Sequence, residues 1–399
     1  MLRMLAAEAA RRFGARAAFD TEGFALSFAD LDRLSDRVAA GMAHRGVRLG
    51  DVVALVLPGG AEYPICFLAA AKIGAVTAGL APGHPATAAL LRRLDPALVI
   101  AAPGVPGVPA TAVVLPCAER RRDRTYAAAR LGGLARPEAP PPPLPPDPLR
   151  PVAVVFTRGR SGPPRGAVFG NAQLSAIRAQ GAGVRWGTGE ARLFGHHPGH
   201  VAFTTRIPVF LQTGRTVHVL PRWDPEAALR VLAGGGVGVL QGTPAQLSGM
   251  LVALGGGRAP SVRLVLSGGA PAAPELIGEV RARFGARVCN RYVCTEAGLG
   301  IGTRPDDPPE DAEVSVGRPG AGVDLSIRDP AGAPVRRGEM GEVLLRSKAV
   351  MSGYFRDPAA SLGAFARDGF VRTGDLGALD GSGRLRLVAA RTGDAESQA

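Results

Sequence analysis

The apolar positions of the chain follow two alternating periods, which predict helices and strands in turn. Residues 28–46 carry apolar side chains at three- and four-residue spacing, which predicts a helix that ends at Gly46. Short apolar runs at 51–57 and 97–102 predict buried strands, and a helix is expected over 63–75. Because strands alternating with helices are typical of parallel, doubly wound sheets, we expect an α/β fold.

A proline-rich stretch, PEAPPPPLPPDP at 137–148, interrupts this alternation. Consecutive prolines exclude helix and central strand, so we expect a semi-rigid surface connector. The alternation then resumes with a strand at 152–156, and a later helix begins at Asp224 as its cap, with proline in its first turn. A further strand at 263–269 ends in glycines.

From about residue 314 the pattern changes to short alternating segments separated by glycine and aspartate turns. Such segments predict an antiparallel, barrel-like subdomain. The expected fold class is therefore α/β, with two doubly wound, mostly parallel sheet subdomains plus a smaller antiparallel barrel-like β subdomain. The expected subdomain ranges are 1–136, 149–313 and 314–391, followed by a hinge remnant and polar tail at 392–399.

Composition narrows the class of protein. Nearly half of the 399 residues are apolar (46%) but only 5% are aromatic, so the core is expected to consist of Ala, Val and Leu. No apolar run is long enough to span a membrane. The N-terminal segment carries charge throughout, which predicts an amphipathic first helix rather than a signal peptide, and we expect a cytoplasmic protein without a membrane partner.

The net charge of +13 comes almost entirely from arginine. The arginines are scattered, with RRRDR at 120–124 as the one cluster, and no aromatic interleaving or zinc-finger pattern accompanies them. An arginine-for-lysine bias explains this best, so no nucleic-acid partner is expected. Polyanion binding through charge alone ranks last among the hypotheses and predicts DNA retention that weakens with salt. The four cysteines show no C-x-x-C pair, which indicates free thiols.

Residues 152–167, VAVVFTRGRSGPPRGA, combine a buried strand with a loop of glycines, small hydroxyls and arginines. Such a loop suits a phosphate, because glycines let the backbone approach and N–H groups, hydroxyls and guanidinium groups donate to its oxygens. The loop lacks the Gly-Lys-Ser/Thr ending of a P-loop NTPase, which excludes that class. An ordinary basic turn is the alternative interpretation.

Ordered motifs over residues 28–394 resemble the large N-terminal domain of the adenylate-forming acyl and aryl ligases. This superfamily includes acyl-CoA synthetases, peptide-synthetase adenylation domains and firefly luciferase. Its phosphate loop reads roughly T-S-G-S/T-T-G-x-P-K-G, and arginine replaces two hydroxyl positions here, at 158 and 160. The resemblance implies that ATP phosphates contact the matching positions Thr157, Gly159, Ser161, Gly162, Arg165 and Gly166.

The segment LFGHHPGHVAFTT at 193–205 is similar to the family segment that carries histidines beside the carboxylate pocket. His197 is the better match, His196 is second and His200 is a further candidate. The resemblance implies that one imidazole orients the substrate carboxylate or lines its pocket. For each histidine, a surface turn is the competing interpretation.

The resemblance also assigns the adenine and magnesium contacts. The SGGAP segment implies that backbone lies along adenine at Gly268, Gly269, Ala270 and Pro271. In CNRYVCTEAG at 289–298, Tyr292 would stack on adenine, Thr295 would donate to the α-phosphate and Glu296 would hold Mg²⁺. The neighbouring Asn290 and Arg291 are included among the expected nucleotide contacts.

Two further motifs complete the expected site. In FVRTGDLG, Asp375 would accept hydrogen bonds from both ribose hydroxyls. Arg391, in a segment similar to the family's hinge, would contact ribose or phosphate, with Asp394 at the hinge itself. The stretch 341–358, with Gly353 and Tyr354, also matches the family and is interpreted as structural.

The family's smaller C-terminal domain, with its lysine on the reacting carboxylate, is expected to be absent, which would remove about 3 kcal/mol of transition-state stabilisation. The expected activity is attack of a carboxylic acid on ATP·Mg²⁺ to give an acyl-adenylate and pyrophosphate. Onward transfer to the thiol of CoA or of an acyl carrier protein would use a separate C-terminal domain protein supplied in trans. The alternative is a non-catalytic relative that binds nucleotide or an acyl group, or that acts as a partner subunit.

Overall fold

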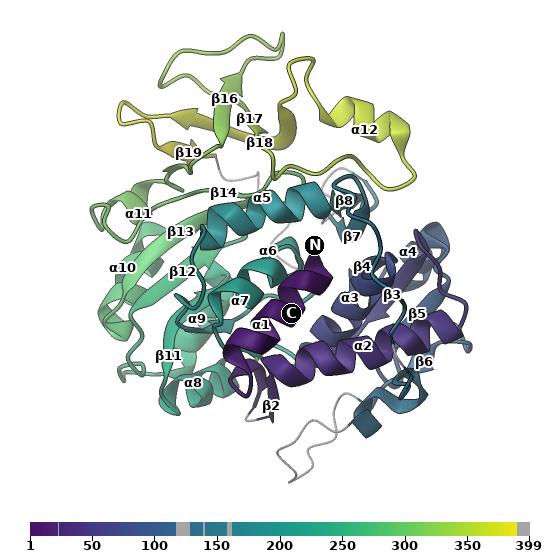
Figure 1. Cartoon of the computed structure of the whole chain (residues 1–399). Coiled ribbons are helices and arrows are strands. Elements are labelled where there is room, and N and C mark those ends of the chain that lie inside the picture. The colour runs from purple at the N-terminus through teal and green to yellow at the C-terminus, as the bar shows by residue number, and fades with distance from the viewer. Residues whose placement is uncertain (23, 117–127, 139, 158–161, 389–399) are drawn as a thin grey trace.

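The computed structural model describes residues 1–22, 24–116, 128–138, 140–157 and 162–388. Within these ranges the strands form three sheets, here called A, B and C, with helices packed against A and B (Figure 1). The mixed α/β architecture with a smaller antiparallel sheet confirms the predicted fold class.

Sheet A has nine strands in the order β15-β14-β13-β12-β11-β9-β10-β1-β2. Its strands from β13 to β1 run parallel, and the outer pairs β13–β14, β14–β15 and β1–β2 are antiparallel. In chain order the strands are β1 Ala17–Thr21, β2 Phe24–Ser27, β9 Ala191–Phe194, β10 Val217–Val219, β11 Val237–Gly242, β12 Leu264–Gly268, β13 Arg287–Cys294, β14 Gly298–Gly302 and β15 Arg318–Pro319.

Sheet B has six strands in the order β6-β5-β3-β4-β7-β8, all parallel except the hairpin of β7 and β8. Its strands are β3 Val52–Val56, β4 Val76–Leu80, β5 Leu98–Ala101, β6 Val113–Val114, β7 Pro151–Phe156 and β8 Gly166–Gly170. Sheet C is a four-stranded antiparallel sheet at the top of Figure 1, built from β16 Asp324–Arg328, β17 Gly341–Arg346, β18 Val371–Leu379 and β19 Leu385–Leu387.

Helices cover both faces of sheet A. Around the central core lie α1 Leu2–Phe13, α2 Phe28–His44, α3 Glu62–Ile73, α5 Asn171–Ala182, α6 Val201–Thr204 and α7 Ile207–Thr213. A second core covers the opposite face of sheet A with α8 Pro225–Ala233, α9 Pro244–Ala253 and α10 Pro274–Phe284. The remaining helices are α4 Thr87–Leu94, the 3₁₀ helix η1 Ala128–Leu134, α11 Asp311–Val314 and α12 Pro358–Ala364.

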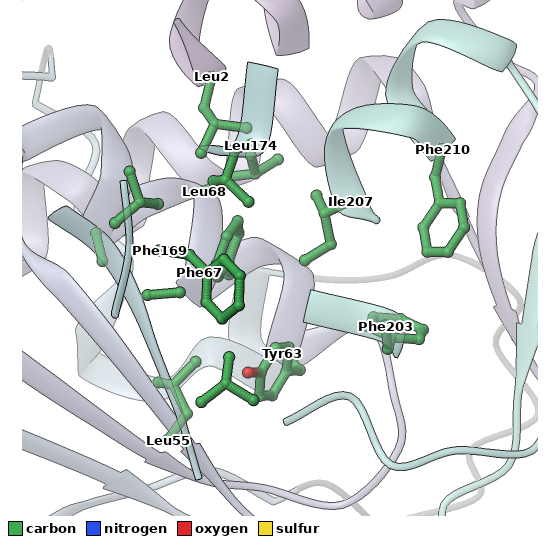
Figure 2. Close-up of a cluster of buried hydrophobic side chains, with 14 of the residues drawn as sticks. Leu2, Leu55, Tyr63, Phe67, Leu68, Phe169, Leu174, Phe203, Ile207 and Phe210 are labelled. Carbon is green, nitrogen blue, oxygen red and sulfur yellow. The ribbon is translucent and has the colours of Figure 1, made fainter. Parts of the chain in front are cut away.

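The central core joins the sheets into one body. Figure 2 shows its aromatic part, in which Phe67 of α3 lies beside Phe169 of β8, while Phe203 of α6 packs against Tyr63 and Phe210. The Tyr63 hydroxyl is fully buried there, 3.1 Å from the hydroxyl of Thr204. The same cluster includes Val343 and Val371 of sheet C, so apolar burial fixes the position of all three sheets.

The sheets do not follow the predicted subdomain ranges. Strands β1 and β2, from the predicted range 1–136, pair at the edge of sheet A. Strands β7 and β8, which follow the connector at 137–148, complete sheet B. The connector therefore does not separate two sheets, because hydrogen bonding of the strands, rather than the position of prolines, sets the membership of a sheet. Among the described residues, no helix is both long enough and apolar enough to cross a membrane.

Candidate active site

A cavity of about 510 Å³ lies where the three sheets meet. Sheet B contributes Thr157, Gly162 and Arg165 from the β7–β8 connection, and sheet A contributes Gly269 and the segment 293–296. Sheet C contributes Asp375. The structure thus brings residues from three distant parts of the chain to one cleft.

Two hydrogen bonds join the ends of the predicted phosphate loop, where β7 ends and β8 begins. Thr157 N donates to Arg165 O at 2.9 Å, and Arg165 N donates to Thr157 Oγ1 at 3.0 Å. The Arg165 guanidinium lies 5.6 Å from the centre of the Tyr354 ring. Arg165 is exposed and faces the cleft, so a positive charge is available beside the loop. Arg158, Gly159, Arg160 and Ser161 lie outside the described residues.

Gly166 is buried in β8 rather than exposed to the cleft. A Cβ at this position would lie 2.5 Å from Cγ1 of Val154, so close strand packing accounts for the glycine. Gly166, expected among the phosphate contacts, is therefore not among the residues that line the cleft. Gly162, by contrast, lines the cleft with a φ of 150° that favours glycine.

Glu296 is held by two neutral donors. The Tyr354 hydroxyl donates to Glu296 Oε1 at 2.7 Å, and the Cys294 thiol donates to Oε2 at 3.1 Å. Burial, and then the nearby Glu296 carboxylate, raise the pKa of both the Tyr354 hydroxyl and the Cys294 thiol. Both donors therefore keep their protons at neutral pH and orient the Glu296 carboxylate toward the cleft.

Glu296 fits a magnesium site of the kind that uses substrate oxygens. The described residues contain no group of three or more His, Cys, Asp or Glu side chains that could hold a metal by themselves. Mg²⁺ bound to nucleotides is commonly held by one or two carboxylates together with phosphate oxygens. A single oriented carboxylate beside a phosphate-binding loop meets that requirement.

Asp375 lies on β18 and is held from sheet A. The Tyr292 hydroxyl donates to Asp375 Oδ2 at 2.5 Å, and Asp375 N donates to Thr373 Oγ1 at 3.2 Å. Burial is the main cause that raises the pKa of Tyr292, so this hydroxyl remains a donor. The Tyr292 ring is 5% exposed and does not line the cleft, so the structure gives it contact with Asp375 instead of the predicted adenine surface.

The four residues of the predicted adenine segment differ in their position relative to the cleft. Gly269 lines the cleft with a φ of 90°. Gly268 is buried, and a Cβ there would lie 2.7 Å from Arg291 O. Ala270 and Pro271 are exposed and are not among the residues that line the cleft. Of the four positions, Gly269 is the one that borders the cavity.

Among the histidines, His200 lines the cleft and His197 does not. Gly199 N donates to His197 Nδ1 at 3.0 Å, so Nε2 carries the proton and donates to Leu57 O at 2.7 Å. Burial lowers the pKa of His197 to about 4, which keeps the imidazole neutral. The structure therefore places His200 at the cleft, whereas both nitrogens of His197 bind backbone. The ring of His196 lies 4.7 Å from that of His200.

Asn290 and Arg291 do not line the cleft either. The Asn290 amide donates to Ser315 O at 2.9 Å and also to Ala312 O, which ties β13 to α11. Arg291 points into a separate cavity. Both residues were included among the expected nucleotide contacts, but the structure commits the Asn290 amide to backbone acceptors and places Arg291 at the other cavity. Arg391 and Asp394 lie outside the described residues.

Sequence reasoning missed several cleft residues. Tyr354 was interpreted as structural, yet its hydroxyl holds Glu296; Gly353–Tyr354 in a matching family stretch was the available signal. Cys294 had no motif that marked it as a donor. Glu342 and Arg372 form a 2.5 Å ion pair at the cleft edge. They lie 30 positions apart in the sequence, and no sequence motif links them.

Comparison with known proteins agrees with this geometry. The family described as AMP-binding enzyme matches residues 6–355, and the chain belongs to this family of adenylate-forming enzymes. It is 30% identical over 396 residues to 4-coumarate–CoA ligase 5 of Oryza sativa subsp. japonica, covering 92% of this chain and 71% of that protein. It is also 30% identical over 424 residues to the salicyl-AMP ligase / salicyl-S-ArCP synthetase of Mycobacterium tuberculosis, covering 97% and 73%.

A solved structure supports the same assignment. The amide bond synthetase McbA of Marinactinospora thermotolerans superposes with a TM-score of 0.77 at 27% identity, covering 97% of this chain and 78% of that protein. The relatives are acyl-CoA and aryl-AMP ligases by name, so the chain is similar to enzymes that activate carboxylic acids with ATP.

Proposed function

We propose that the chain uses ATP and Mg²⁺ to activate a small carboxylic acid as an acyl-adenylate. The observation that carries the proposal is the single cleft lined by Arg165, Glu296 and Asp375. A cation beside a glycine loop suits the polyphosphate, and a half-buried carboxylate suits the two ribose hydroxyls. Similarity to acyl-CoA and aryl-AMP ligases supports the same reaction class.

Each cleft residue has a role that follows from its contacts. Arg165 and the backbone near Gly162 bind the β- and γ-phosphates, while Thr295 donates to the α-phosphate. Asp375 accepts from the ribose, and Tyr292 is a positioning residue that holds the Asp375 carboxylate. His200, rather than His197, lies beside the reacting acid.

Glu296 is the residue that would hold Mg²⁺, oriented by Tyr354 and Cys294. When bound, the metal neutralises charge on the phosphate oxygens. The protein's contribution is to place the two reacting groups together, because positioning supplies much of the rate in such transfers.

The chemical step needs no proton transfer, because the acid enters as its carboxylate. One carboxylate oxygen forms a bond to the α-phosphorus, and the bond from that phosphorus to the oxygen bridging to the β-phosphorus breaks. The electron pair leaves with pyrophosphate, and the acyl-adenylate remains. Onward transfer to the thiol of CoA or an acyl carrier protein would release AMP. We place the reaction in the cytoplasm.

Acid-dependent exchange of labelled pyrophosphate into ATP tests the proposal. Aryl and fatty acids are supplied as a panel, with and without the C-terminal domain of a relative. We expect exchange with at least one acid, and we expect Glu296→Gln to reduce it about a hundredfold or more. The matched control is Glu310→Gln, since Glu310 is exposed and its side chain makes no cap hydrogen bond.

Absence of acid-dependent exchange under all these conditions would contradict the proposal. If ATP still bound, the chain would instead be a nucleotide- or acyl-binding relative or a partner subunit. Equal loss of exchange in the Glu296→Gln and Glu310→Gln variants would show that Glu296 has no specific role in the site.

A further inference from the structure

A second cavity, of about 330 Å³, lies between α5, the turn that joins α6 to α7, and strand β14. Arg206, Arg291, Arg304 and Arg318 line it, and no carboxylate of the described residues does. The other lining residues are mostly glycine and aliphatic, among them Gly300 and Leu299. The cavity is therefore positively charged and has apolar walls.

Among the described residues, Arg206, Arg291 and Arg304 make no ion pair, and burial affects the first two. Across the described ranges, the Arg206 guanidinium makes no hydrogen bond or ion pair. Arg291 uses only Nη1, which donates to the carbonyl oxygens of Asn290 and Thr303. Arg318, by contrast, is paired with Asp311 at 2.9 Å.

The surrounding charges add to this excess. Burial, and then the charge of Arg291, lower the pKa of Arg206 to about 10. Burial, and then neighbouring arginines that include Arg206 and Arg291, lower the pKa of Arg192 on β9. The Nε atom of Arg192 is buried with no partner among the described residues. Two nearby carboxylates act on this group but are paired with other arginines: Glu190, which affects Arg192, lies 2.5 Å from Arg263, and Asp307, which affects Arg291, lies 3.8 Å from Arg318. Buried charges without partners are costly, and a bound anion would remove that cost.

Neighbouring residues of the same two segments of chain line the nucleotide cleft and the second cavity. Val293 and Thr295 line the cleft, and Arg291, two positions before Val293 on β13, lines the second cavity. His200, directly before α6, lines the cleft, and Arg206, directly before α7, lines the second cavity. At about 3.3 Å per residue of strand, Arg291 lies roughly 13 Å along the chain from Thr295.

We propose that this cavity binds a second carboxylate at the far end of the acid, so that the substrate is a dicarboxylic acid. The inference rests on the proposed function, which places the reacting carboxylate beside Thr295 and His200. The far carboxylate then lies between the guanidinium groups of Arg206 and Arg291, which match a carboxylate in planar geometry. Phosphate has the same anionic chemistry, so the test includes it.

Calorimetric titration of acids into the full chain, saturated with a non-hydrolysable ATP analogue and Mg²⁺, tests the proposal. The probes are dicarboxylic acids from succinate to suberate, their monomethyl esters, and inorganic phosphate. We expect at least one dicarboxylate to bind about tenfold or more tightly than its monomethyl ester, the magnitude of a lost charge-assisted hydrogen bond. The Arg206→Met variant should lose this preference.

Arg258→Met is the matched control, because Arg258 is exposed and lies outside both cavities. Cooperative thermal unfolding and unchanged affinity for the ATP analogue show that Arg206→Met is folded. Arg206→Lys should keep part of the preference for the diacid.

Tighter or equal binding of the monomethyl esters would overturn the dicarboxylate proposal while leaving acid activation intact. Binding of inorganic phosphate that depends on Arg206, with no dicarboxylate bound, would also overturn it. Failure of the ATP analogue to bind would instead count against the proposed function itself.

Discussion

His197 illustrates how single residues in this chain are assigned by their contacts. Its two ring nitrogens bind Leu57 O and Gly199 N, so the side chain fastens the segment before α6 to the end of β3. His200, three positions later, lines the cleft. The sequence HHPGH shows that a histidine borders the site but not which one, because the choice depends on the direction of each ring.

The buried His197 predicts that stability falls in mild acid. Its pKa is about 4 in the folded protein and about 6.5 when unfolded, so between these values the unfolded chain binds a proton that the folded chain does not. Stability from this group is complete above about pH 6.5 and is lost as the pH falls toward about 4, by up to about 3 kcal/mol. Chemical denaturation across this range measures the loss.

The loss should be smaller in His197→Gln, which cannot take up a proton. His44→Gln is the control, because His44 lies near the solvent at the end of α2. An unchanged pH dependence in His197→Gln would show that His197 is not buried in its neutral form.

At the scale of elements, the helices were predicted well because their limits are local signals. The helix predicted from residue 28 ends near Gly46 as expected, and α8 begins at Asp224, whose side chain accepts from Ala227 N. Membership of the sheets was predicted less well. Strands β1 and β2 join sheet A through pairing with β10, about 200 positions away, and no local pattern records that pairing.

Lys72 gives a measurable contact between two elements. Its ammonium on α3 donates to Asp32 Oδ1 at 2.7 Å and to Asp36 Oδ1 at 2.8 Å on α2, and its side chain is 1% exposed. Because removal of one partner leaves charges in a partly buried place, Lys72→Met should reduce the free energy of unfolding by about 3 kcal/mol. Chemical denaturation measures the change.

Lys348→Met is the matched control, since Lys348 is exposed and should change stability little. In the Lys72→Met background, replacing Asp32 and Asp36 with Asn should restore part of the stability by removing the unpaired charges. A stable Lys72→Met protein with no such recovery would show that the ion pairs contribute little.

At the scale of the whole molecule, the cleft exists because one apolar core fixes all three sheets. The motifs at Arg165, Glu296 and Asp375 were recognised from the sequence, and the structure brings them to a single cavity. The contacts that orient them were not predictable. Tyr354 and Tyr292 reach their carboxylates from elements 58 and 83 positions away, and only the assembled fold creates those hydrogen bonds.

The second cavity could likewise not be predicted from the sequence. Its arginines at 206 and 291 lie in a chain with many scattered arginines, and composition explains the excess of charge without reference to a site. Both are affected by burial and make no ion pair among the described residues, and these properties appear only in three dimensions.

Equilibrium binding of ATP·Mg²⁺ to the full chain tests most directly that the three sheets form a nucleotide site. Asp375→Asn should weaken binding about tenfold or more, because a charged acceptor for the ribose hydroxyls is lost. Asp306→Asn, at an exposed carboxylate outside the cleft, should bind as the unaltered chain does. No binding by the unaltered chain, or equal binding by the Asp375→Asn variant, would contradict the account.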